Sequence, residues 1–179
     1  MAGMAKPAPP AEAPYIVVMG VAGCGKSLVG ARLAAQLKLP LVEGDDFHPD
    51  GNIEKMRQGI PLTDVDRAEW LQRLADELRA QPAGAVLTCS ALKRSYRNAL
   101  RGAVPDLRFV HLALTEHQAL ERVASRTDHF YPPSLVASQF EALEDPSTEP
   151  GVLVADATAH IDRVVDSAAR WAAQPFNNA

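Results

Sequence analysis

Gly20-Val21-Ala22-Gly23-Cys24-Gly25-Lys26-Ser27 fits the pattern G-x-x-x-x-G-K-[ST], which is that of a phosphate-binding loop. An apolar, β-branched run over residues 15–19 precedes it, as expected of a buried parallel strand. Apolar residues at helical spacing follow it over residues 28–37. The pattern therefore lies between a strand and a helix, which is the context that phosphate binding requires.

The residue types of this loop predict binding of a nucleoside triphosphate. Glycines let the backbone turn so that its N–H groups point at phosphate oxygens, and the helix N-terminus adds a partial positive charge. Lys26 can reach the β- and γ-phosphates, and the hydroxyl of Ser27 can bind Mg²⁺. A glycine-rich turn that binds nothing is the alternative, and the agreement of strand, spacing and helix makes it the weaker one.

The composition is that of one globular domain. The 179 residues suffice for a substantial core, and 47% hydrophobic and 22% charged residues are ordinary values. A net charge of -4 argues against nucleic-acid binding, and no apolar run reaches the length of a membrane helix. Two cysteines form no disulfide framework and fit a cytoplasmic location. We expect a disordered tail over residues 1–14, rich in Ala and Pro, before a single domain over 15–173.

Strand and helix patterns alternate along the rest of the chain. This alternation predicts an α/β fold with a five-stranded parallel sheet flanked by helices. Thr63 and Thr115 are expected to begin helices through capping boxes with Asp66 and Gln118, and Ser90 to cap a helix over 91–101. The later strands are expected at residues 39–43, 85–89, 107–112 and 151–155.

Acidic residues follow the second strand, where ligands bind in an open α/β sheet. If that strand continues to Asp45, the carboxylates of Glu43 and Asp45 point to one side of it and suit Mg²⁺ and a substrate hydroxyl. A solvated acidic turn is the alternative. The third strand ends in Thr88-Cys89-Ser90 and supplies no aspartate for a metal, which favours Glu43 and Asp45.

Two groups of cations indicate anion binding. Lys93 and Arg97 are four residues apart and share a helix face after the third strand, although a basic surface helix would show the same pattern. Arg122 and Arg126, again four apart, precede an aromatic and proline-rich loop. We expect a lid over about residues 126–134 that brings these arginines to phosphates. His129 is either a lid contact or an ordinary loop residue.

Several stretches of this chain together form the pattern of one family. They are the loop 20–27, the runs Glu43-Gly44-Asp45-Asp46-Phe47-His48-Pro49 and Asn52-Ile53-Glu54-Lys55-Met56, residues 59–67 with Trp70, Cys89-Ser90-Ala91-Leu92-Lys93 with Tyr96-Arg97 and Leu100-Arg101, His129-Phe130, and Gln139-Phe140-Glu141-Ala142-Leu143-Glu144. The cluster over residues 44–67, joined to the stretch over residues 89–97, makes the pattern specific. From about residue 16 to residue 165 the chain closely resembles this family, the P-loop gluconokinases.

The resemblance implies a fold like that of the shikimate and nucleoside monophosphate kinases, a homodimer, and ATP-dependent phosphorylation of D-gluconate. Where the related shikimate kinases have an aspartate at the end of the second strand, this chain has Glu43. A kinase for another small acid such as shikimate, and a non-catalytic nucleotide-binding module, remain the alternatives. The implied roles are ATP binding by residues 20–27, Arg122 and Arg126, metal binding by Ser27, Glu43 and Asp45, gluconate binding by Asp45, His48, Lys55, Arg67, Lys93, Arg97 and His129, and catalysis by Lys26, Asp45 and Arg126.

Overall fold

The computed structural model describes residues 14–126 and 131–176. The tail expected over residues 1–14 lies outside them except for its last residue, as does the centre of the lid expected over 126–134, His129 included. Within the described part of the chain, no helix has both the length and the apolar character needed to cross a membrane.

Five parallel strands form one sheet in the order β2-β3-β1-β4-β5, which confirms the predicted α/β architecture. The central strand β1 precedes the phosphate-binding loop and is flanked by β3 and β4, so the loop starts near the middle of the sheet edge. The strands are β1 Tyr15–Met19, β2 Leu41–Glu43, β3 Ala85–Thr88, β4 Arg108–Ala113 and β5 Val152–Asp156.

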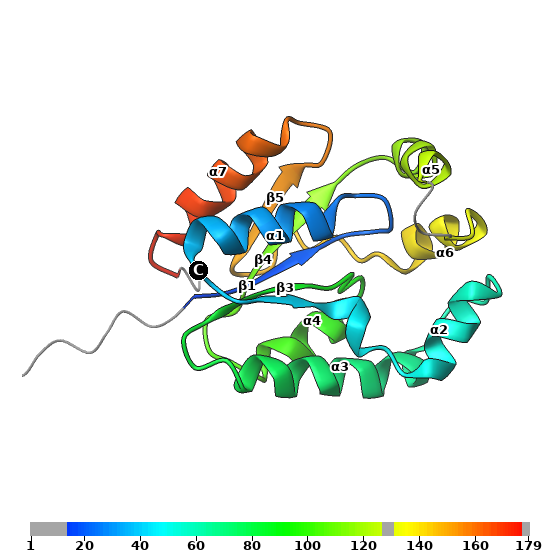
Figure 1. Cartoon of the computed structure of the whole chain (residues 1–179), viewed down its shortest axis with the longest axis horizontal. Helices are drawn as coiled ribbons and strands as arrows, with labels where there is room; N and C mark the ends of the chain where they lie inside the picture. Colours follow the sequence, from blue (N-terminus) through cyan, green and yellow to red (C-terminus); the bar gives the residue numbers. More distant parts are fainter. Residues whose placement is uncertain (1–13, 127–130, 177–179) are drawn as a thin grey trace, which may run out of the picture.

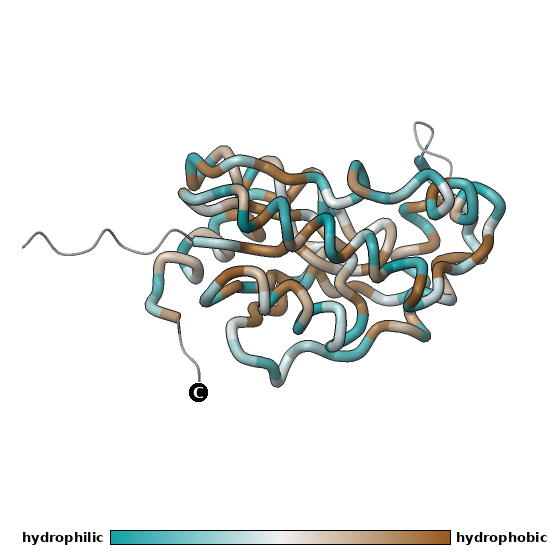
Figure 2. Tube along the Cα trace, turned by 90° about the horizontal axis from the view of Figure 1, so that it is seen from below, coloured by the Kyte–Doolittle hydropathy of each residue, from teal (hydrophilic) through white to brown (hydrophobic). Residues whose placement is uncertain are grey.

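Helices cover both faces of the sheet (Figure 1). Because side chains alternate along a strand, Ile16 and Val18 of β1 pack toward α1 (Lys26–Leu37) and α7 (Ile161–Ala172), whereas Val17 and Met19 pack toward α3 (Asp64–Arg79) and α4 (Arg94–Arg101). These residues belong to two hydrophobic cores, one on each side of the sheet. Figure 2 shows hydrophobic segments of the chain in brown alternating with hydrophilic ones in teal. The remaining helices are α2 (Asp50–Arg57), α5 (Glu116–Ser125) and α6 (Ser134–Ala142), which lie at the carboxyl end of the sheet.

Both predicted capping boxes are present. The hydroxyl of Thr63 accepts from the backbone N–H of Asp66 at 3.2 Å, and the carboxylate of Asp66 accepts from the Thr63 N–H at 2.9 Å. Thr115 and Gln118 make the same pair of bonds at the start of α5. A capping box involves only residues three positions apart, so its formation depends little on the rest of the chain.

One condition was not met, and one local prediction was wrong. Strand β2 ends at Glu43, where the second strand was expected to end, and gives way to the 3₁₀-helix η1 (Gly44–Phe47), so the strand does not continue to Asp45 and the two carboxylates do not share one side of it. Helix α4 begins at Arg94 with Lys93 as its N-cap, because Ala91 takes a left-handed conformation (φ 46°) that a helix cannot contain. Ser90 consequently belongs to the loop after β3 and not to a helix cap.

Candidate active site

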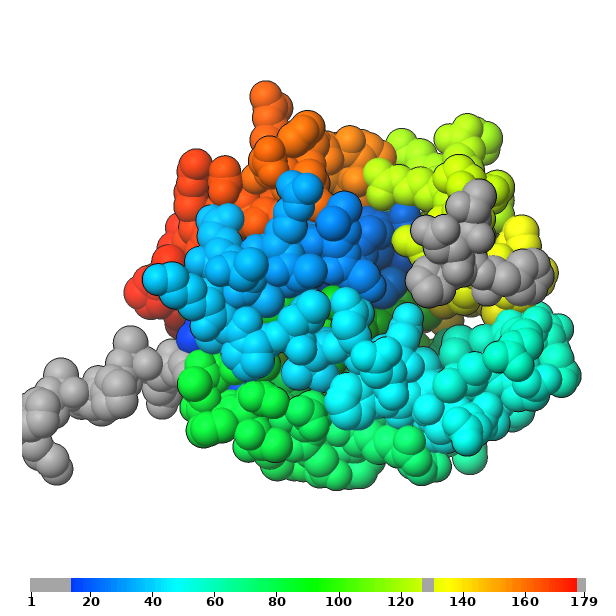
Figure 3. Space-filling model, viewed as in Figure 1, coloured from blue at the N-terminus to red at the C-terminus, as the bar shows by residue number. Residues whose placement is uncertain are grey.

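A cavity of about 550 Å³ opens at the carboxyl ends of the strands, where open α/β sheets bind ligands. In the space-filling view the molecule is hollowed between the α1 side and the α2 side (Figure 3). Predicted site residues that line the cavity are Ala22, Gly23, Gly25, Lys26, Ser27, Asp45, His48, Arg67 and Arg126. Lining residues that sequence reasoning did not assign are Ile53, Met56, Arg57, Leu62, Trp70, Ser90, Tyr131 and Gln139.

The loop over residues 20–27, the P-loop, has the backbone that its glycines predict. Gly23 and Gly25 have φ values of 82° and 93°, which side chains with a Cβ atom rarely adopt. Gly25 is also the N-cap of α1, and no side chain caps this helix end. The ammonium of Lys26 folds back over the loop and donates to the carbonyl oxygens of Gly20 (3.0 Å) and Val21 (3.1 Å). The loop thus offers a helix N-terminus and one cation to a phosphate group.

Two side-chain oxygens that could bind a metal ion, those of Ser27 and Glu43, lie close together beside the P-loop. The hydroxyl of Ser27 lies 3.1 Å from Oε2 of Glu43, and the hydroxyl of Thr88 donates to that same oxygen at 2.7 Å. Thr88 in turn accepts from the N–H of Gly44 at 3.2 Å, so β3 fixes the carboxylate. Hydroxyl and carboxylate oxygens are the ligands that Mg²⁺ prefers, so the pair Ser27–Glu43 fits this ion. The orienting role of Thr88 depends on strand pairing and had no sequence signal.

Asp45 lies on η1 at the wall of the cavity, and its side chain is 86% exposed. Next to it the ring of His48 is buried and stacks on Trp70, with ring centroids 4.2 Å apart. Trp70 anchors η1 through a 2.8 Å bond from Nε1 to the carbonyl of Gly44. Burial lowers the pKa of His48 to about 4 against the opposing effect of Asp45, so the ring is neutral at pH 7. Trp70 therefore belongs to the core and also supports the site.

Arg67 is the cation that α3 directs to the cavity. Its Nη1 donates to the carbonyl of Leu62 at 2.8 Å and to the hydroxyl of Tyr96 at 3.3 Å. The guanidinium carbon lies 5.4 Å from the centre of the Tyr96 ring. These contacts hold the side chain by one edge, which suits it to clamp an anion with the rest of its fork.

Two predicted substrate ligands lie outside the lining of the cavity. Lys55 is paired with Asp66 at 2.8 Å and Lys93 with Asp64 at 2.9 Å. Asp64 also accepts from the hydroxyl of Tyr96. In this conformation both lysines are engaged by carboxylates at the start of α3.

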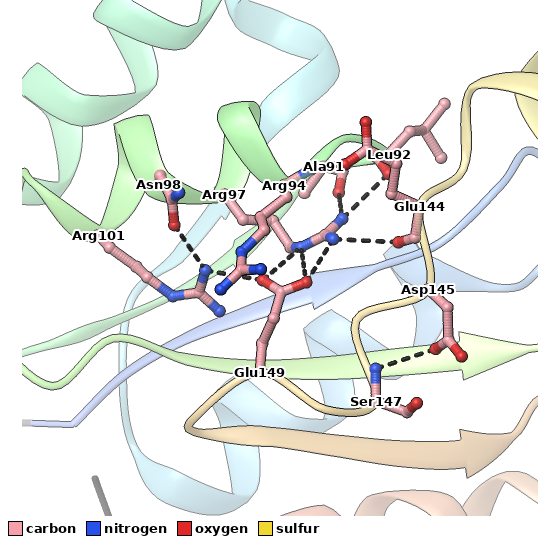
Figure 4. Close-up of polar contacts among 10 residues, drawn as sticks. All are labelled: Ala91, Leu92, Arg94, Arg97, Asn98, Arg101, Glu144, Asp145, Ser147 and Glu149. Carbon is pink, nitrogen blue, oxygen red and sulfur yellow. Dashed lines mark hydrogen bonds and ion pairs between the residues drawn. The ribbon is translucent and has the colours of Figure 1, made fainter.

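The prediction that Arg97 binds substrate was wrong. Its side chain is fully buried (0% exposed) and paired with Glu149, whose side chain is 3% exposed (Figure 4). Nη1 donates to the carbonyl oxygens of Ala91 (2.7 Å) and Leu92 (3.0 Å), and Nη2 to that of Glu144 (3.0 Å). The helix face shared with Lys93 was inferred for a longer helix, whereas α4 starts after Lys93 and turns Arg97 into the protein.

Arg122 of α5 and Arg126 at the end of this helix line two different cavities. Arg126 lines the main cavity. Arg122 donates to the carbonyl oxygens of Gly23 and Cys24 at 3.3 Å and to that of Ala157 at 2.7 Å. It lines a second cavity of about 250 Å³, whose other walls are mostly apolar, between the P-loop and the start of α7.

Gln139 of α6 was not assigned a role from the sequence, although it stands in a run that carries the family resemblance. Its Oε1 accepts from the N–H of Ala22 in the P-loop at 2.6 Å, and its Nε2 donates to the hydroxyl of Tyr131 at 2.6 Å. Burial raises the pKa of Tyr131 to about 12, so this hydroxyl is protonated at neutral pH. The side-chain amide of Gln139 therefore links α6 to both the P-loop and Tyr131.

The parallel sheet, the P-loop and a cavity lined by both Lys26 and Asp45 are the features of a P-loop kinase acting on a small molecule. Residues 16–150 match the family described as "AAA domain". The chain is 45% identical to the gluconokinase of Gluconobacter oxydans (strain 621H), covering 87% of this chain and 89% of that one. It is 41% identical to the thermoresistant gluconokinase of Escherichia coli (strain K12), over 84% and 89% of the two chains.

A solved structure gives the same relationship. The crystal structure of a gluconokinase from Sinorhizobium meliloti 1021 superposes with a TM-score of 0.84 at 44% identity, covering 90% of this chain and 93% of that one. The chain belongs to the gluconokinase family.

Proposed function

We propose that the protein transfers the γ-phosphate of ATP to D-gluconate and forms 6-phospho-D-gluconate. One observation carries this proposal: Lys26 of the P-loop and Asp45 of η1 line the same cavity, so a phosphate donor and a hydroxyl acceptor can meet there. The family membership supplies the identity of the acceptor.

The P-loop residues 20–27 hold the phosphates of ATP. Backbone N–H groups and the N-terminus of α1 face the phosphates, and Lys26 exchanges its carbonyl partners for their oxygens. Ser27 and Glu43 would hold Mg²⁺, which when bound neutralises negative charge on the β- and γ-phosphates. Arg126 lies on the cavity wall and stabilises the charge of the group in transfer.

Asp45 positions the terminal hydroxyl of gluconate and accepts its proton. The hydroxyl oxygen forms a bond to the γ-phosphorus while the bond from phosphorus to the bridging oxygen of ADP breaks. His48 and Arg67 line the same cavity, and Arg67 is the cation we assign to the carboxylate of gluconate because its fork is held by one edge. Asp46 does not line the cavity and is the weaker candidate for the base.

The second cavity suits the adenine base. It adjoins Gly25 of the P-loop, and Leu28, Val29, Ala157 and Ile161 give it apolar walls. Arg122 closes one side through its bond to the carbonyl of Ala157. We therefore assign the turn after β5 to the base; in this turn the hydroxyl of Thr158 donates to the carboxylate of Asp156.

A homodimer is expected from the family resemblance, and analytical ultracentrifugation of the purified protein measures it directly. A mass of one chain, 19.2 kDa, at micromolar concentration would contradict this expectation.

The function is tested by measuring ADP release with ATP and Mg²⁺ in parallel reactions containing gluconate, shikimate, a nucleoside monophosphate or no acceptor. We expect turnover with gluconate alone. Turnover with another acceptor would keep the phosphate machinery and overturn the substrate. ATP binding without turnover in any reaction would favour a non-catalytic nucleotide-binding module.

A further inference from the structure

Asn52, in the first turn of α2, is a buried polar residue that the proposed mechanism does not use. It is 5% exposed, and its Nδ2 lies 2.9 Å from the backbone carbonyl of Asp66 and 3.3 Å from Nδ1 of His48. An amide nitrogen carries two hydrogens, so it can serve both neighbours at once. The side chain thus connects α2, the start of α3 and the imidazole at the cavity wall.

The carbonyl of Asp66 decides which way the amide of Asn52 faces. A carbonyl oxygen only accepts hydrogen bonds, so the atom 2.9 Å from it must be the amide nitrogen and not the amide oxygen. The opposite orientation would place two oxygens against each other in a buried position. The same nitrogen then donates its second hydrogen toward His48.

The orientation of Asn52 in turn decides the state of the His48 ring. A nitrogen that faces an N–H donor must present a lone pair, so Nδ1 carries no proton. The ring is neutral, since a protonated ring would set one N–H against another, and its single proton is on Nε2. Burial of the ring against Trp70 acts in the same direction.

Nε2 faces the reacting end of the site. It lies 3.9 Å from Oδ1 of Asp45, and Arg67 is the other charged group that lines the cavity near the ring. An Nε2–H donor is therefore directed at a carboxylate or at a substrate oxygen placed beside it. With the opposite tautomer the ring would present a lone pair to the same carboxylate, which would repel it.

We propose that Asn52 is a positioning residue that fixes His48 in the Nε2–H tautomer, so that the ring presents a hydrogen-bond donor to Asp45 and to the acceptor substrate. The kinetic consequence rests on the proposed function, whereas the tautomer itself does not. Asn52 touches no substrate in this proposal and acts only through His48.

The first test is the tautomer of the wild-type protein. Nitrogen-15 labelled histidine and long-range proton–nitrogen correlation spectra at pH 7 distinguish a protonated ring nitrogen from one with a lone pair, and His48→Gln identifies the signal. We expect Nε2 to be protonated and Nδ1 not. A protonated Nδ1 would overturn the proposal, whatever the substrate proves to be.

Variants at Asn52 supply the second test. In Asn52→Asp the side chain accepts where the amide donated, so we expect the ring proton to appear on Nδ1. Asn52→Leu removes the donor at similar size, and we expect kcat with gluconate to fall about tenfold, the effect of one ordinary hydrogen bond, with KM for ATP unchanged. Unchanged ring signals in Asn52→Asp, or full kcat in Asn52→Leu, would contradict the proposal.

Asn98→Asp is the matched control, because Asn98 is exposed on α4 and uses its Oδ1 to accept from Arg101 at 2.9 Å, which a carboxylate does equally well. It adds the same charge and should change neither the His48 signals nor kcat. Thermal unfolding of each variant shows whether it folds. If Asn52→Asp does not fold, the wild-type spectrum still decides the tautomer.

Discussion

Arg97 and Glu149, 52 residues apart in the chain, form a forked ion pair in the interior. Nη2 of the guanidinium lies 2.6 Å from Oε2 of the carboxylate, and Nε lies 3.0 Å from Oε1. Arg101 adds a bond to Oε1 at 2.8 Å. The pair joins the loop after β3, which brings Ser90 to the cavity, to the connection between α6 and β5 (Figure 4). Arg97 therefore organises the wall of the site without reaching the ligand.

Replacing Arg97 by Met should destabilise the fold strongly. The change leaves the buried carboxylate of Glu149 without its main partner, and losing one member of a buried pair reduces the free energy of unfolding by about 3–5 kcal/mol. Urea denaturation followed by circular dichroism measures it. Arg94→Met removes the same charge from an exposed position of α4 and should change stability by less than about 0.5 kcal/mol. A similar small loss for both variants would contradict the assignment.

The features predicted correctly from the sequence are those set by neighbours in the chain. The P-loop lies between β1 and α1, and both capping boxes form, because each pattern depends on residues no more than seven positions apart. The alternation of strands and helices predicts the fold class, a parallel α/β sheet, but not the order of the strands in that sheet. Nothing local distinguishes one permutation of parallel strands from another.

The features missed from the sequence depend on distant contacts. Gly44 approaches the carbonyl of Thr88 so closely that an added Cβ would lie 2.0 Å from it, and at this point the chain leaves β2 for η1. The spacing of Lys93 and Arg97 predicted a shared helix face, but α4 begins only after Lys93, and no local pattern indicates that Glu149 is the buried partner of Arg97. The roles of Gln139 and Asn52 likewise could not be predicted, because they depend on the contacts that α6 and α2 make in the folded protein.

Asp66 should make the stability of the protein depend on pH in the acid range. The hydrogen bond from Lys55, with that from the Thr63 backbone, lowers the pKa of this carboxyl from 3.8 to about 2. Because the folded-state pKa is the lower one, the stabilisation is present above about pH 4 and is lost as the pH falls through about 2. Asp66→Asn should therefore be less stable than wild type above pH 4, and the difference should shrink toward pH 2.

Urea midpoints measured from pH 5 to pH 2 test this expectation for Asp66. Asp106→Asn provides the control, since it makes the same change in an exposed turn. Asp106 has a left-handed backbone conformation (φ 53°), which asparagine adopts as readily as aspartate. A difference between Asp66→Asn and wild type that stays constant over the whole range would show that the carboxyl does not act through its ionisation.

Gln139→Glu should impair use of ATP. A glutamate can still accept from the N–H of Ala22, but it cannot donate to Tyr131 when ionised, and it places a negative charge beside the phosphates. We expect kcat/KM for ATP to fall by about tenfold or more, and less at high salt because ions screen the repulsion. Steady-state kinetics at two ionic strengths measure both effects.

The matched control for Gln139 is Gln118→Glu. Gln118 is the third residue of α5 and completes its capping box with Thr115, where glutamate serves as well as glutamine, so activity should be unchanged. Equal activity of both variants would mean that the bond between α6 and the P-loop has no part in ATP binding or transfer.

Asp45→Asn tests the assignment of the base. The amide keeps the shape of the side chain but cannot accept the proton of the attacking hydroxyl, so kcat with gluconate should fall by about 10²–10⁴ while the Kd for ATP stays the same. The neighbouring Asp46→Asn removes an equal charge from the same 3₁₀-helix and should retain most of the activity, because Asp46 does not line the cavity. Rapid-quench measurement of the first turnover separates the chemical step from product release. If Asp45→Asn phosphorylates gluconate near the wild-type rate, or if Asp46→Asn shows the larger loss, then the proton goes elsewhere and Asp45 serves at most to orient the substrate.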